Sequence, residues 1–183
     1  MSIKEGIPYP KIQQAKMFAM GAHVGHKHSS RPFWCHLRDT VNIIMRHKLD
    51  TVDLLCAAWL HDVIEDTPAT YQDIRELFGE KIADLVWAVT DEMGRNRYER
   101  LQKSREKNFA TRESTILKTA DLAANINASF EHEDFNHLVM YKTEWPSISE
   151  LFFDKIQEKA PKAMPILADI NHLMWKEINP KNE

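Results

Sequence analysis

Thr51 to Pro68 read TVDLLCAAWLHDVIEDTP, and this stretch decides the fold. Its first ten residues are apolar around most of a helical circumference, as expected of a central helix that other helices surround. Asp66 and Thr67 then lead into Pro68, and the residue before a proline is disfavoured in α geometry. The stretch therefore predicts one central helix over about 51–65 that ends in ionisable residues.

Four ionisable side chains directly follow the apolar segment: His61, Asp62, Glu65 and Asp66. Charged groups are rarely buried without partners, so their attachment to a core segment indicates a site that needs them. On a continuous helix, His61/Glu65 and Asp62/Asp66 are i, i+4 pairs within a single sector. We therefore expect the four side chains to converge on one small volume.

The rest of the sequence also has the apolar period of helices, and β-branched alternation is nearly absent. Further helices are predicted over 10–24, 32–47, 70–79, 82–89, 113–129, from 148 onward and over 162–178. Thr70 with Asp73 and Ser147 with Glu150 have the spacing of capping boxes. Residues 91–112 are strongly basic and almost without apolar period, which predicts a loop or a surface helix. The predicted fold class is all-α.

The chain of 183 residues is 43% hydrophobic and 28% charged, which excludes the disordered and fibrous classes. Its length suits one domain over 1–183, with a core of about 15–127 and C-terminal helices over about 134–178.

A net charge of −3 argues against a nucleic-acid polymer as partner. Cys35 and Cys56 have apolar neighbours and are typical of core residues rather than a disulfide. Without a signal core or a membrane-length apolar run, we expect a cytoplasmic protein, and homo-oligomerisation stays open.

The adjacent His61 and Asp62 offer an imidazole nitrogen and a carboxylate oxygen, donors that suit Mn, Fe, Co, Ni or Zn better than Mg or Ca. Two more candidate ligands are His36, inside PFWCHLRDTV, and Asp121, inside ILKTADLAANI. Such a dipeptide alone more often caps a helix or forms hydrogen bonds than binds a metal. With the two distant candidates added, the pattern favours a metal site.

Several other polar groups have an ordinary interpretation beside a functional one. Lys118 falls on one helical stripe with Asp121 and Asn125, where it either pairs with an acid or contacts a phosphate. The histidines of the segment HVGHKH could bind zinc, but no cysteine accompanies them and solvated loop histidines are commoner. These histidines are His23, His26 and His28. The basic run 95–112 is usually a solvated face, although near an anionic substrate it could bind phosphates.

At these residues the sequence resembles a known family. His36, the HD at 61–62 and the KTAD ending at Asp121 match, in order and approximate spacing, the H…HD…D signature of the HD-domain metal phosphohydrolases. AAWLHDVIEDTPATYQDIRELFGEKIADLVWAVTDE resembles the RelA/SpoT-type alarmone hydrolase domain in its HDxxEDT stretch, its FG helix end and the following VT. AMGAHVGHKHSSRPFWCHLRDTV is similar to that family's H-x-G-Q…P-Y-x-x-H segment. The resemblance covers about 15–127.

The resemblance implies a site built around one divalent metal, commonly Mn²⁺ in this family. The implied ligands are His36, His61, Asp62 and Asp121. Glu65 and Asp66 would serve the hydrolytic water. Contacts to a nucleotide substrate would come from Lys27, Arg31, Arg97, Lys118 and Asn125. The family usually has arginine where His28 and Leu122 stand, and Arg97 and Arg100 are candidates to replace that charge.

The implied function is a metal-dependent phosphohydrolase of a phosphorylated nucleotide, with guanosine-3′,5′-bis(diphosphate) 3′-pyrophosphohydrolase activity as the leading case. One alternative is a 5′-nucleotidase or dNTP phosphohydrolase of the wider HD class. Another is a nucleotide-binding protein without turnover, against which the presence of Glu65 and Asp66 argues.

Overall fold

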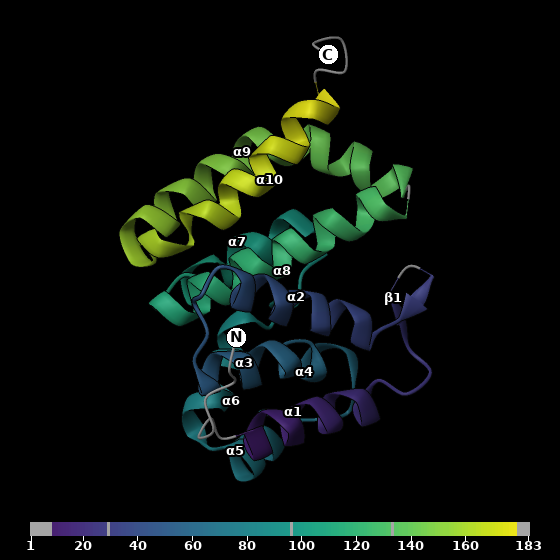
Figure 1. Cartoon of the computed structure of the whole chain (residues 1–183), viewed down its shortest axis with the longest axis vertical. Helices are drawn as coiled ribbons and strands as arrows, with labels where there is room; N and C mark the ends of the chain where they lie inside the picture. The colour runs from purple at the N-terminus through teal and green to yellow at the C-terminus, as the bar shows by residue number, and fades with distance from the viewer. Residues whose placement is uncertain (1–8, 29, 96, 133, 179–183) are drawn as a thin grey trace, which may run out of the picture.

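The computed structural model describes residues 9–28, 30–95, 97–132 and 134–178, and its architecture is almost entirely helical (Figure 1). The α-helices are α1 (Tyr9–Ala22), α2 (Trp34–Arg46), α3 (Val52–Leu60), α4 (Val63–Asp66), α5 (Tyr71–Phe78), α6 (Glu80–Val89), α7 (Arg97–Asn108), α8 (Arg112–Glu131), α9 (Phe135–Lys159) and α10 (Met164–Ile178). A 3-10 turn over Pro161–Ala163 precedes α10, and β1 (Lys27–His28) pairs antiparallel with β2 (Arg31–Pro32). The all-α prediction is confirmed. None of the described helices combines the length and apolarity that crossing a membrane needs.

Helix α3 is surrounded by other helices, as its apolar circumference predicts, and Figure 1 shows it between α2 and α1. Every residue from Leu54 to Leu60 is buried, and α1, α2, α6 and α8 pack around the helix. Thr51 caps its start, where its hydroxyl accepts a hydrogen bond from the Leu54 N–H at 3.3 Å. The core therefore fixes the position of the two residues that directly follow α3.

The prediction of one continuous helix over 51–65 is wrong. Helix α3 ends at Leu60, and α4 begins at Val63. Between them Asp62 has φ −99° and ψ −2°, a bridge conformation that is frequent in turns and at functional sites. The His61 and Asp62 side chains therefore project from a turn rather than from a regular helical face.

The segments flanking this turn agree with their local sequence signals. Thr70 and Asp73 form the predicted capping box at the start of α5. Gly79, at φ +88°, separates α5 from α6 in a backbone conformation that favours glycine. Within the basic segment 91–112, the surface-helix alternative is borne out, because α7 occupies 97–108.

The predicted helix start near 148 is wrong, because α9 already begins at Phe135 and passes through Pro146. Asp134 caps this earlier start by accepting a hydrogen bond from the His137 N–H at 3.3 Å. The buried face of α9 has a continuous helical period made by Tyr141, Trp145, Ile148, Phe152 and Ile156. Packing of that face outweighs the proline, and Figure 1 shows α9 changing direction along its length.

Candidate metal centre and substrate pocket

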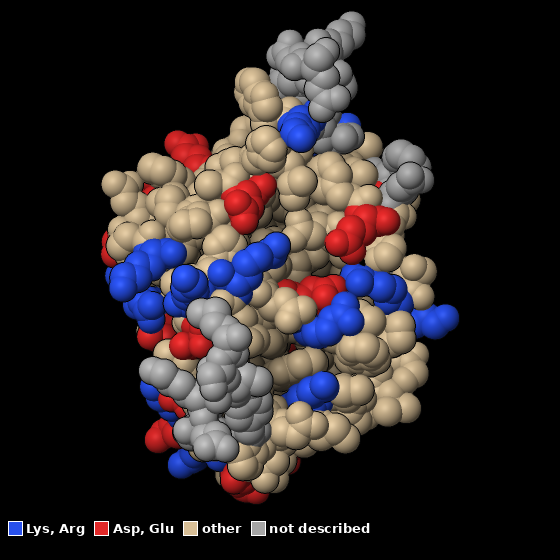
Figure 2. Space-filling model, in the orientation of Figure 1, with Lys and Arg blue, Asp and Glu red and all other residues tan. Residues whose placement is uncertain are grey.

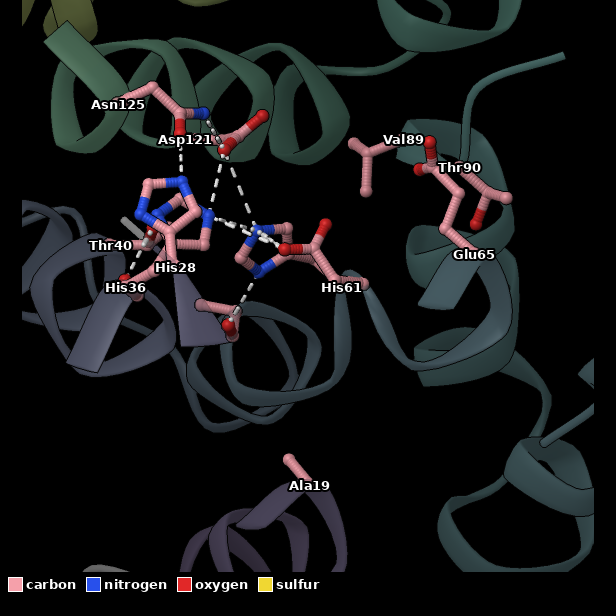
Figure 3. Close-up of polar contacts among 12 residues, drawn as sticks. Ala19, His28, His36, Thr40, His61, Glu65, Val89, Thr90, Asp121 and Asn125 are labelled. Carbon is pink, nitrogen blue, oxygen red and sulfur yellow. Dashed lines mark hydrogen bonds and ion pairs between the residues drawn. The ribbon is translucent and has the colours of Figure 1, made fainter. Parts of the chain in front are cut away.

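Two imidazoles from separate helical segments meet in the buried interior (Figure 3). His36 lies on α2 and His61 directly follows α3, and their side chains are 3% and 2% exposed. Their Nε2 atoms are 3.1 Å apart. Oδ2 of Asp62 lies 3.4 Å from the His36 Nε2 and 3.1 Å from the His61 Nε2. The turn between α3 and α4 thus brings the carboxylate to both imidazoles.

Asp121 reaches the same two nitrogens from α8. Its Oδ1 lies 3.2 Å from the His36 Nε2 and 3.6 Å from the His61 Nε2. The amide of Asn125, one turn further along α8, donates a hydrogen bond to Oδ1 of Asp121 at 2.8 Å. Lys118, one turn before Asp121, places Nζ 3.6 Å from the other carboxylate oxygen, Oδ2. Lys118 and Asn125 therefore both contact Asp121, as their shared helical stripe in the sequence indicated.

The protonation pattern of His61 fits a metal ligand. Its Nδ1 lies 2.9 Å from the carbonyl oxygen of Ala58, which can only accept, so Nδ1 carries the proton. The neutral ring then directs the Nε2 lone pair at His36 and the carboxylates. Fixing the far nitrogen of a histidine in this way is typical of metal-binding imidazoles.

The spacing of donor atoms on His36, His61 and Asp62 also fits a shared ion, and Asp121 lies beside both imidazoles. Donors about 2.1 Å from one ion lie about 3.0 Å apart at right angles and about 3.4 Å apart at tetrahedral angles. The separations between the two Nε2 atoms, and between each of them and the two carboxylate oxygens, run from 3.1 to 3.6 Å. Mixed imidazole and carboxylate donors suit a transition ion such as Mn, Fe or Zn. His36, His61 and Asp62 could therefore hold a metal, with Asp121 as a neighbouring candidate ligand.

The electrostatics of the cluster call for a positive charge between the donors. Burial lowers the pKa of His61, but the charge of Asp62 and hydrogen bonding to Asp121 outweigh it, so the pKa lies well above its ordinary value. Burial likewise opposes charge on His36, yet hydrogen bonding to Asp121 and Asp62 raises its pKa. Burial would raise the pKa of Asp62, whereas the adjacent imidazoles hold it far below the usual range. A proton or a metal ion between these side chains would balance the negative charge of the carboxylates.

Glu65 and Asp66, the candidates for serving water, line the pocket beside the cluster but are not part of it. Figure 3 shows Glu65 beside Val89 and Thr90, where its Oε2 accepts a hydrogen bond from the Asp91 N–H at 3.1 Å. Both carboxylates reach solvent. Partial burial, followed by the charge of Asp62, raises the pKa of each above its ordinary value. A carboxylate with a raised pKa is a better proton acceptor for water.

The cluster opens into a pocket of about 280 Å³. Of the predicted substrate contacts, Lys118 and Asn125 line it. Lys27 and Arg31 are not among the described lining residues, and Arg31 pairs with Asp39 at 3.0 Å. Those two contacts stay predictions. Arg97 begins α7, but its side chain lies outside the part of the chain that the structure describes.

The three histidines considered for zinc lie in different environments, although the rings of His23 and His26 are in edge contact at 5.7 Å. Nδ1 of His23 donates to the Ala19 carbonyl at 2.9 Å, and its ring stacks on Phe33 at 4.4 Å. His26 is exposed. His28 lies 3.0 Å from Oδ1 of Asn125 and stacks on His36 at 4.7 Å. Burial and then the neighbouring His36 lower the pKa of His28.

Sequence reasoning missed part of the pocket wall. Asp91 was not singled out, because its role depends on Lys118, which lies 27 residues away along the chain and 3.4 Å away in space. Tyr141, Ile148 and Phe152 enter the pocket from α9. Their i, i+7 and i+11 apolar period was the available signal, and Pro146 obscured it.

Comparison with known proteins agrees with this architecture. Residues 15–124 match the family model described as the HD domain. The bifunctional (p)ppGpp synthase/hydrolase SpoT of Escherichia coli K12 is 47% identical over 81 residues, which cover 44% of this chain and 11% of SpoT. The guanosine-3′,5′-bis(diphosphate) 3′-pyrophosphohydrolase of Aquifex aeolicus is 34% identical over 122 residues, 63% of this chain and 17% of that protein. The chain thus spans less than a fifth of the length of these curated relatives.

A solved structure shares the fold along nearly its whole length. It is that of a metazoan ortholog of SpoT that hydrolyzes ppGpp, and it superposes with a TM-score of 0.73 at 22% sequence identity. The match covers 92% of this chain and 97% of the other. Because the family model spans more than half of the sequence, the chain belongs to the HD-domain family.

Proposed function

We propose that the chain is a metal-dependent phosphohydrolase of phosphorylated nucleotides, and that its leading reaction is release of the 3′-pyrophosphate from guanosine-3′,5′-bis(diphosphate). The observation that carries this proposal is that Nε2 of His36 and Nε2 of His61 each lie within 3.6 Å of carboxylate oxygens of Asp62 and Asp121, beside a pocket that holds three further carboxylates. The names of the relatives, which describe hydrolases of that nucleotide, support the choice of substrate.

The four clustered side chains are the proposed ligands of one divalent ion, with Mn²⁺ as the first candidate. Such an ion, when bound, polarises a phosphoryl oxygen and makes water more acidic. Glu65 is the proposed acceptor of the proton from the attacking water, because its pKa is raised and the Asp91 N–H fixes one of its oxygens. Asp66 has a similar environment and is the second candidate.

Two further lining residues would hold the metal cluster in position. Lys118 forms ion pairs with Asp91 and Asp121, so its proposed role is to hold the ligand Asp121 in place. Asn125 bridges Asp121 and His28, and thereby connects the metal cluster to the pocket wall. We also propose that residues 1–183 form a single domain and that the protein is cytoplasmic.

A screen of purified protein against a nucleotide panel tests the function. The panel contains guanosine-3′,5′-bis(diphosphate), dNTPs and nucleoside monophosphates, each with Mn²⁺ and with a chelator. We expect Mn²⁺-dependent release of pyrophosphate from the first compound. Release of phosphate from monophosphates, or of triphosphate from dNTPs, would instead favour the 5′-nucleotidase or dNTP phosphohydrolase alternative. Tight binding without turnover would favour a binding protein.

Variants identify the site within the same screen. Asp121→Asn removes a charged donor and should abolish activity, whereas Asp169→Asn is a matched control on α10, where Asp169 lies 3.3 Å from His47 rather than in the pocket. If Asp121→Asn were as active as the unchanged protein toward every substrate, the proposed metal centre would be wrong.

A further inference from the structure

The pocket has two chemically different sides. Its acidic side chains come mainly from the α3–α4 turn, α4 and the segment after α6. Its apolar ones include Leu122 on α8 and the α9 residues Tyr141, Ile148 and Phe152. Figure 1 places α9 across α8 from α3 and α4. A substrate bound at the cluster would therefore extend toward an uncharged, aromatic wall.

The formal charge of the lining is strongly negative. Five carboxylates and two basic side chains are among the described lining residues, which leaves a charge of −3 with neutral histidines. A divalent ion would bring this only to −1. On the face of the molecule in Figure 2, basic and acidic side chains are interspersed.

Of the two basic side chains among the described residues that line the pocket, only one is placed to bind a ligand. Lys118 Nζ lies 3.4 Å from Asp91 and 3.6 Å from Asp121, and donates to the Val89 carbonyl at 3.3 Å. Arg100, the other basic residue of the lining, has no hydrogen bond or ion pair to the residues that the structure describes.

The position of Arg100 depends on a close backbone approach. A Cβ atom at Gly94 would lie 2.8 Å from both the N and the Cγ of Arg100, so only glycine lets this segment pack against α7 there.

The guanidinium of Arg100 can bind about one phosphate group of a ligand, because arginine pairs with phosphate bidentately.

We infer that this site ranks its nucleotides by the charge that they carry away from the scissile group, favouring a 5′-monophosphate over a 5′-diphosphate and a 5′-diphosphate over a 5′-triphosphate. The inference rests on the proposed function and specifies its substrate class. Each added 5′-phosphate brings at least one negative charge toward a lining that is already negative. Two like unit charges about 8 Å apart in water repel each other enough to lower a binding constant about two- to threefold.

The test compares guanosine 3′-diphosphates that differ only at the 5′ position. Compounds with a 5′-mono-, di- and triphosphate are assayed with saturating Mn²⁺ at low salt. We expect kcat/KM to fall about twofold or more with each added phosphate. Because salt screens the repulsion, raising the ionic strength tenfold should compress this spread. Binding of the same compounds to the chelator-treated protein, measured by calorimetry, should follow the same order and does not depend on turnover.

Two pairs of variants separate charge from packing. Leu122→Lys adds a cation whose long stem can reach the pocket, and should favour the 5′-triphosphate relative to the 5′-monophosphate. Leu122→Met keeps the side chain neutral and should leave the ranking unchanged. Arg100→Gln should weaken binding of every compound and steepen the ranking. Arg105→Gln, at an exposed position on α7 outside the pocket lining, is its control.

The outcomes are distinct. Equal kcat/KM across the series at low salt, or a preference for the 5′-triphosphate, would overturn the inference while leaving the hydrolase proposal intact. Absence of hydrolysis of all three compounds would overturn the proposed function and this inference together. If Leu122→Lys fails to fold, the Arg100→Gln ranking and the salt dependence still decide the question.

Discussion

Nε2 of His36 and Nε2 of His61 lie 3.1 Å apart in the buried interior, with carboxylate oxygens of Asp62 and Asp121 within 3.6 Å of both. Two imidazole nitrogens do not approach this closely without a proton or a cation between or beside them. The same positions are therefore open to competition between protons and a metal ion, which makes metal binding depend on pH.

Metal affinity should fall as the pH falls. The pKa values of His36 and His61 are both raised above 6.5 in the metal-free protein, so each ring begins to bind a proton at a pH above that value. A metal ion must displace these protons. We expect Mn²⁺ affinity, measured by titration calorimetry from pH 8.5 to 5.5, to decrease by up to about tenfold per pH unit for each proton displaced. An affinity that stays constant over this range would show that the two imidazoles are not ligands.

Glu65→Gln should separate chemistry from metal binding. The substitution keeps the shape of the side chain but removes the group that accepts the proton from water. We expect kcat to fall about 100-fold or more, since general base catalysis typically contributes that much. Mn²⁺ affinity should stay within about threefold, because Glu65 is not within the cluster. Glu106→Gln, at an exposed position on α7, is the control. A large loss of metal affinity in Glu65→Gln would instead make Glu65 a ligand.

The sequence predicted the components of the site better than their arrangement. His36, Asp121 and the pair at 61–62 could be selected because each is an ionisable group in an apolar segment, which signals a buried partner. The break after Leu60 could not be foreseen, since the apolar and polar pattern continues through it. Asp62 also lies 3.4 Å from His36, a tertiary contact that has no local sequence signal.

The fold was predictable where periodicity and caps agree. Helix α5, with its Thr70 capping box and Gly79 end, follows both signals. Helix α9 did not, because Pro146 and the apparent Ser147 cap suggested a start that packing overrides. From the sequence alone, Lys118 could either pair with an acid or contact a phosphate. The structure gives it two acid partners, which only the fold brings within reach.

Lys118→Met should weaken metal binding without removing any ligand. Lys118 holds the second oxygen of Asp121 at 3.6 Å and links it to Asp91 at 3.4 Å, and its own pKa is strongly raised because these acids outweigh burial. Methionine keeps the apolar stem but loses this link. We expect Mn²⁺ affinity to fall about tenfold, as is usual when a group that orients a ligand is lost.

The control for Lys118→Met is Lys103→Met. Lys103 is a half-exposed residue that pairs with Glu99 at 3.2 Å on α7. Its substitution should leave Mn²⁺ affinity unchanged. If Lys118→Met retained full metal affinity but lost affinity for the nucleotide, Lys118 would be a phosphate contact rather than a residue that positions Asp121.

Leu60→Ala should test how strongly the core fixes the turn that carries the site. Leu60 is fully buried at the end of α3 and precedes His61. Truncating a buried leucine costs about 2–5 kcal/mol in the free energy of unfolding, because it removes packing and leaves a cavity. Leu77→Ala, on α5, removes the same atoms from a side chain that is 58% exposed and should change stability by about 0.5 kcal/mol or less. Urea unfolding in the presence of a chelator measures both values without a contribution from metal binding. Similar losses for the two variants would contradict the central position of α3, and with it the explanation of why His61 and Asp62 are held so closely.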